Sequence, residues 1–161
     1  MVNSAIFKIK MELLNLPDYS HRLRLSPSKD KIFDSIRKKY VALTPEEWVR
    51  QNFIAFLTQE LHYPPGLLAL EYPLSLNGLS KRCDLVVFNS MGEARMILEF
   101  KASSVKIDQK VFDQIALYNL KLKVDYLIVS NGLSHFCCRM DYLKNSYQFL
   151  EKVPVFDVIK Q

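Results

Sequence analysis

Asp84, Glu99 and Lys101 have the residue types and the spacing of a metal-dependent hydrolytic site. The two acids lie in neighbouring apolar segments that are joined by the turn-forming sequence NSMG. If this turn is centred between Met91 and Gly92, Asp84 lies opposite Glu99 in an antiparallel hairpin, with Cβ atoms about 4.5–5.5 Å apart. Two carboxylates so placed repel each other unless a proton or a cation relieves them.

The chemistry that suits this trio is phosphodiester hydrolysis. Mg²⁺ prefers oxygen ligands and commonly takes only one or two protein carboxylates, together with water and substrate phosphate. Side chains two residues apart on a strand share a face, so Lys101 projects beside Glu99. The ammonium can then orient or deprotonate a water, or offset the growing negative charge. The trio therefore predicts a nucleic-acid phosphodiesterase that uses Mg²⁺, with Mn²⁺ as the alternative ion.

The alternative interpretation is that these are ordinary charges on the solvent face of a strand. Asp84 is followed by Leu-Val-Val-Phe, however, and Glu99 is preceded by Met-Ile-Leu. Charged groups in such apolar surroundings are costly unless they are paired or have a role. The surroundings favour the functional interpretation.

A helix is predicted to begin at Thr44, upstream of the trio. Thr44 is a suitable N-cap, Pro45 suits the first helical position, and Glu47 would complete a capping box. The helix should end before Pro64.

The rest of the pattern predicts an α/β fold with a mixed sheet of about five strands flanked by helices. A three-stranded meander precedes a second helix, which is followed by two more strands. The tail, 146–161, is ambiguous. The predicted strands are 67–76, 82–88, 94–101, 124–130 and 135–140, and the second helix is 107–122.

Composition is that of one globular domain spanning residues 1–161, with 1–43 as a peripheral extension and 44–140 as the core. The formal net charge of +5 favours a polyanionic partner, for which DNA is the first candidate. The 3 cysteines form neither a disulfide framework nor a zinc half-site, which indicates a reduced, cytoplasmic protein. No apolar run is long enough for a membrane span.

The hairpin with D84 and E99-F-K101, preceded by an acidic helix, resembles the PD-(D/E)xK nuclease superfamily. More narrowly, the chain resembles the N-terminal nuclease domain of type I restriction enzyme R subunits, whose fold is the restriction-endonuclease-like core. The most discriminating match is a QxxxY motif formed by Gln114 and Tyr118. The matching stretches are TPEEWVRQ, KRCDLVVF, ILEFKA and DQIALYN.

The resemblance implies that Asp84 and Glu99 are metal ligands and that Lys101 is the catalytic lysine. Gln114 and Tyr118, which share a helix face, would assist the site or contact DNA. An acid on the first helix would complete the metal shell. Glu47 is the first choice and Glu46 the second, although both also suit the first turn of a helix.

The residues expected to contact the DNA backbone are Arg50, Gln51, Arg82 and Lys110. Cys83 stands where the family usually has proline, which weakens the motif match but removes no ligand. There is no GxxxxGK[ST] phosphate loop. The chain therefore resembles the nuclease module without its motor, and a partner translocase or specificity subunit is expected.

Two other functions remain open at this stage. The chain can be a DNA-binding module with the nuclease fold that acts only together with such a partner. Its substrate can also be RNA, because the sequence contains nothing that distinguishes the two nucleic acids.

Overall fold

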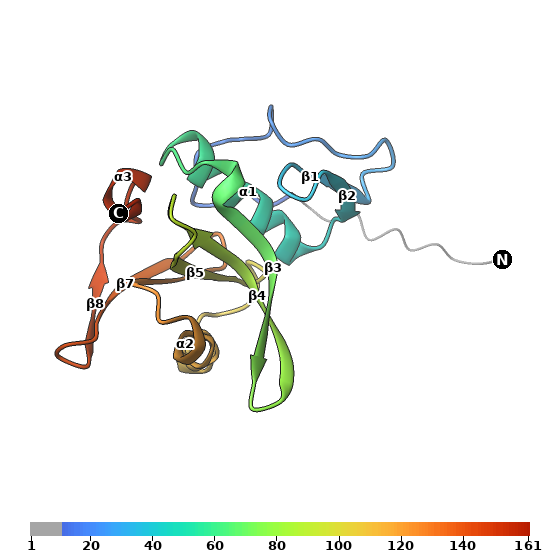
Figure 1. The fold of residues 1–161 in the computed structure, drawn as a ribbon. Coiled ribbons are helices and arrows are strands. Elements are labelled where there is room, and N and C mark those ends of the chain that lie inside the picture. The colour runs from blue at the N-terminus through green and yellow to red at the C-terminus, as the bar shows by residue number, and fades with distance from the viewer. Residues whose placement is uncertain (1–10) are drawn as a thin grey trace.

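The central feature of the computed structural model, which describes residues 11–161, is a six-stranded mixed sheet in the order β3-β4-β5-β6-β7-β8. Helix α1 lies on one face of this sheet and α2 on the other (Figure 1). The elements are β1 (Lys31–Asp34), β2 (Lys39–Ala42), α1 (Pro45–Gln59), a 3₁₀ turn (Pro65–Leu67), β3 (Leu68–Leu76), β4 (Leu79–Phe88), β5 (Ala94–Phe100), α2 (Gln109–Leu122), β6 (Tyr126–Ser130), β7 (His135–Asp141), β8 (Ser146–Leu150) and α3 (Phe156–Ile159). The predicted α/β fold is confirmed.

The tail supplies the sixth strand, because β8 pairs with β7 along the edge of the sheet. Ile159 of α3 is fully buried in the core, and the Tyr63 hydroxyl donates to the Pro154 carbonyl at 2.8 Å. The packed structure thus continues beyond residue 140. The first ten residues of the predicted peripheral extension lie outside the part that is described.

Helix α1 begins as predicted, with the Thr44 hydroxyl accepting from the Glu47 backbone N–H at 3.0 Å. The expected capping box is wrong in its second half. The Glu47 carboxylate turns to Arg37, Arg50 and Gln51, and the Thr44 N–H donates to a backbone carbonyl instead. A charged partner offers this carboxylate a stronger hydrogen bond than the backbone does.

The hairpin β4–β5 has the predicted register, with Leu85 opposite Leu98 and Val86 opposite Ile97. A bulge next to Phe88 absorbs the irregular turn. In the preceding hairpin β3–β4 the turn residues Asn77 and Gly78 have φ of 51° and 76°. These values are what a two-residue hairpin turn requires.

Strand β5 is buried on both faces. Met96, Leu98 and Phe100 pack into the α1-side core, as predicted, and Ile97 packs into the α2-side core. Glu99 therefore lies in a strand without a solvent face. This placement makes its charge costly unless a cation or a proton compensates it.

Gly132, after β6, is expected to tolerate no side chain. Its φ is +83°, and an added Cβ would lie 2.7 Å from Leu14 Cδ2 and 3.1 Å from Val49 Cγ2. Gly132→Ala should therefore lower the free energy of unfolding by about 1–3 kcal/mol, measured by urea denaturation. Gly66→Ala is the control, because its Cβ meets open space among the described residues. Equal losses for the two variants would contradict the prediction.

Candidate active site

Asp84 lies where β4 and β5 separate, one residue beyond the last backbone pair. Its N–H donates to Glu99 Oε1 at 3.4 Å, and its Oδ2 accepts from the Phe100 N–H at 2.7 Å. The Asp84 side chain thus accepts from a β5 N–H beyond the last backbone pair of the two strands. The two acids lie side by side, as the hairpin register predicts.

Glu99 is only 2% exposed. Burial, and next the negative charge of Asp84, raise the pKa of Glu99 to about 9, while Lys101 acts in the opposite direction. The pair is therefore unstable as two free anions. A divalent cation held by the two carboxylates would offset both the cost of burying their charges and their mutual repulsion. The donor set therefore fits a hard metal ion.

Within residues 11–161 no group of three or more acidic, histidine or cysteine side chains is arranged to hold a metal ion. A Mg²⁺ ion held by Asp84 and Glu99 would take its other ligands from water and phosphate, as Mg²⁺ usually does in proteins.

Lys101, Gln114 and Tyr118 form a chain of polar contacts beside the acids. Lys101 Nζ donates to Gln114 Oε1 at 3.4 Å, and Gln114 Nε2 donates to the Tyr118 hydroxyl at 3.1 Å. Burial raises the pKa of Tyr118, and the charge of Glu99 adds to this effect. Helix α2 therefore presents both members of the QxxxY motif to the lysine and the acids.

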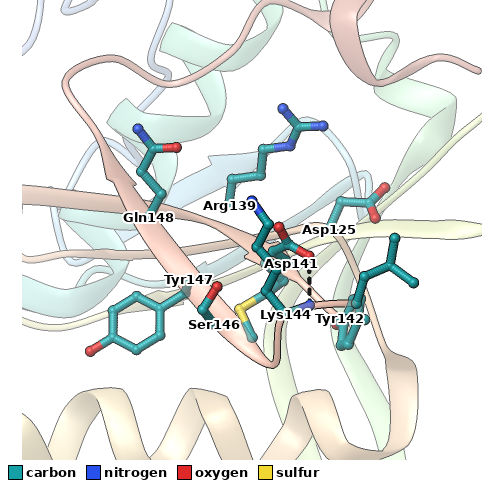
Figure 2. Close-up of a pocket in the computed structure, with 10 residues that line it drawn as sticks. Asp125, Arg139, Asp141, Tyr142, Lys144, Ser146, Tyr147 and Gln148 are labelled. Carbon is teal, nitrogen blue, oxygen red and sulfur yellow. Dashed lines mark hydrogen bonds between the residues drawn. The ribbon is translucent and has the colours of Figure 1, made fainter.

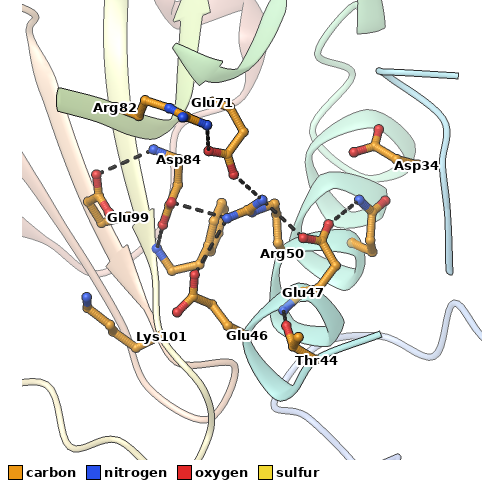
Figure 3. Close-up of polar contacts among 12 residues, drawn as sticks. Asp34, Thr44, Glu46, Glu47, Arg50, Glu71, Arg82, Asp84, Glu99 and Lys101 are labelled. Carbon is orange, nitrogen blue, oxygen red and sulfur yellow. Dashed lines mark hydrogen bonds and ion pairs between the residues drawn. The ribbon is translucent and has the colours of Figure 1, made fainter. Parts of the chain in front are cut away.

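The two glutamates of the first turn of α1 point in different directions (Figure 3). Glu47 is buried, with Oε1 bound by Arg37 and Gln51 and Oε2 bound by Arg50. Burial, followed by the charge of Asp84, raises the pKa of Glu46, and Arg50 and Lys101 lower it. Glu46, the second choice in the sequence analysis, is thus the glutamate that faces the site. Glu47, the first choice, is turned away from it.

Arg50 and Gln51 were expected to contact DNA, and this expectation is corrected. Arg50 is 4% exposed and contacts carboxylates, while Gln51 is buried and donates to Glu47 at 2.8 Å. Both side chains point inward because the acids around them require positive charge and hydrogen-bond donors. Neither can reach a DNA backbone from this position.

Arg82 and Lys110 remain predicted phosphate contacts. The Arg82 side chain is 70% exposed, with its Nη1 3.8 Å from Glu71 Oε2, and Lys110 is exposed in the first turn of α2. Both are free to turn toward a ligand, because exposed ion pairs hold side chains only weakly.

Glu71 is an acid whose importance the sequence did not reveal. Its φ is +53° in the middle of β3, where extended backbone is the rule. This conformation costs a non-glycine residue about 1 kcal/mol or more. It brings the Glu71 carboxylate to 2.8 Å from Arg50 Nη1. The signal available in the sequence was an arginine within the apolar part of α1, which requires buried acids as partners.

The cavity of about 580 Å³ shown in Figure 2 lies elsewhere, along the β7–β8 hairpin. Its two aspartates already have partners. Asp125 forms an ion pair with Arg95 at 2.7 Å, and Asp141 accepts the Lys144 backbone N–H at 3.0 Å. We therefore place the candidate active site at Asp84 and Glu99 rather than in this cavity.

Comparisons with known proteins show the family and the fold. The family described as "Type I restriction enzyme R protein N terminus" matches residues 45–154, which include all of these acids. A solved fragment of a proposed HsdR subunit of a type I restriction enzyme from Vibrio vulnificus YJ016 has a similar fold, with a TM-score of 0.53 at 18% identity. The match covers 73% of this chain and 24% of that one, so the chain spans about a quarter of its length. No curated protein gave a significant match.

Proposed function

Because the chain belongs to the type I restriction enzyme R protein N-terminal family, we propose that it is a Mg²⁺-dependent nuclease that hydrolyses DNA phosphodiester bonds. The observation that carries the proposal is the contact between Asp84 and Glu99 beside Lys101. The Gln114–Tyr118 contact next to this lysine supports a PD-(D/E)xK site.

Each residue has a distinct role in the proposed reaction. Asp84 and Glu99 would hold the metal ion, and Glu46 would face its shell of water and phosphate ligands. The bound ion supplies a water of lowered pKa and stabilises charge on the phosphate. Lys101 would orient a water or offset the charge of the pentacoordinate phosphate, and Gln114 holds the ammonium in place.

A second candidate function is a nuclease-fold module that cleaves only with a partner translocase or specificity subunit. One observation favours it: Arg50 contacts Asp84 at 3.2 Å, which occupies an oxygen that the metal would need. The match covers only 24% of the Vibrio chain, so most of that protein consists of parts that this match does not include.

The direct test is cleavage of linear, circular and single-stranded DNA, and of RNA, by the purified chain. We expect loss of intact DNA with Mg²⁺ or Mn²⁺ and complete protection with EDTA, whereas cleavage of RNA alone would contradict DNA as the substrate. Asp84→Asn is the control for contaminating nucleases, because it removes one proposed ligand at nearly constant size. Cleavage that survives EDTA or Asp84→Asn would contradict the proposal, and cleavage only with a partner would favour the second candidate.

A further inference from the structure

Arg50 lies at the centre of four carboxylates that come from three elements (Figure 3). Its two terminal nitrogens divide these acids into pairs. Nη1 contacts Glu71 at 2.8 Å and Glu47 at 3.1 Å, whereas Nη2 contacts Asp84 at 3.2 Å and Glu46 at 3.6 Å. The shorter contacts thus go to acids outside the proposed metal site, and the longer ones go to acids within it.

The Nη1 side of the arginine is firmly held. Glu47 is anchored by α1 and by a second cation, Arg37. Glu71 owes its position to the left-handed backbone of β3, which interrupts regular pairing with β4 at the position opposite Asp84. A strained residue persists only where its surroundings over-determine it. The Arg50–Glu71 contact is therefore a built feature of the fold.

The Nη2 side contacts two acids that face the proposed metal site. Asp84 Oδ2 already accepts from the Phe100 N–H, so Oδ1 is the oxygen left for a cation, and Arg50 contacts it. A guanidinium and a divalent ion on one oxygen repel each other strongly in a partly buried site. The two cations therefore compete for Asp84 Oδ1.

We propose that Arg50 is a resident cation that competes with the divalent metal ion for Asp84 and Glu46, and that Glu71 and Glu47 retain its guanidinium when the metal binds. The inference rests on the proposed function. Arg50 is then a positioning residue that neutralises the acids before the metal arrives. It also weakens metal binding until a DNA phosphate adds its oxygens to the metal shell.

The test is calorimetric titration of the DNA-free protein with Mn²⁺. Arg50→Gln removes the competing charge and is expected to tighten Mn²⁺ binding by about tenfold. Glu71→Gln removes an acid that draws Arg50 away from Asp84, and it should weaken Mn²⁺ binding by about threefold. These opposite changes distinguish competition from a structural role, which would weaken binding in both variants.

Lys121→Gln is the control, because it removes one exposed positive charge in the last turn of α2. Its Mn²⁺ affinity should stay within about twofold of wild type. Binding by Arg50→Gln that is equal to or weaker than wild type overturns the inference and leaves the proposed function standing. If Arg50→Gln does not fold, unchanged binding by Glu71→Gln overturns it. Absence of Mn²⁺ binding in wild type and in every variant overturns both proposals.

Discussion

Replacing Lys101 with alanine is expected to lower the rate of DNA cleavage by about 10³-fold without weakening Mn²⁺ binding. The ammonium lies beside Glu99 and is held by Gln114 at 3.4 Å, so it is placed to act on the water or on the phosphate. The two proposed ligands, Asp84 and Glu99, remain in Lys101→Ala. Single-turnover cleavage and Mn²⁺ calorimetry on the same preparation measure the two effects separately.

The matched control is Lys121→Ala, an exposed lysine in the last turn of α2. It lowers the net charge by the same amount, so any general loss of DNA affinity appears in both variants. Cleavage by Lys121→Ala should stay close to that of wild type. Equal cleavage by Lys101→Ala and wild type would exclude a catalytic role for the lysine.

Replacing Glu99 with glutamine is expected to stabilise the metal-free protein at alkaline pH by about 2 kcal/mol or more. The pKa of Glu99 is raised to about 9 from an ordinary value of 4.5, so the folded state keeps a proton that the unfolded state has lost. The wild-type free energy of unfolding should therefore fall as pH rises through this window. Glutamine cannot ionise, which removes this fall.

Urea denaturation in EDTA from pH 5 to pH 9 measures this effect. The advantage of Glu99→Gln should be small at pH 5 and should grow toward pH 9. Glu151→Gln, which changes an exposed glutamate beyond β8, is the control and should show no such growth. A pH-independent difference between Glu99→Gln and wild type would show that the folded protein does not hold Glu99 protonated.

The hairpin that carries the acids could be predicted because its determinants are local. The turn sequence set the register, and the alternating apolar residues of β5 set the direction of Leu98 and Phe100. The start of α1 was equally local, since Thr44 and Pro45 specify it without tertiary contacts.

The parts that could not be predicted depend on contacts between distant elements. Glu46 and Glu47 are adjacent and equally suited to a first turn, and only Arg37 and Arg50 decide which carboxylate turns away from Asp84. Arg50 resembled an exposed helix residue because its acidic partner Glu71 follows 21 residues later. Strand β8 was ambiguous because it lies at the edge of the sheet with most of its side chains exposed.

The parallel pairing of β5 with β6 determines when the site can be complete during folding. The acids come from a hairpin, whose closure requires only a short turn. The Lys101 N–H, in contrast, bonds to the Ser130 carbonyl at 2.9 Å, so its backbone is fixed only after α2 has crossed over and β6 has docked. Such non-local pairing forms late because it must close a long loop. We therefore expect the backbone of Lys101 to be fixed later in folding than the hairpin that carries the two acids.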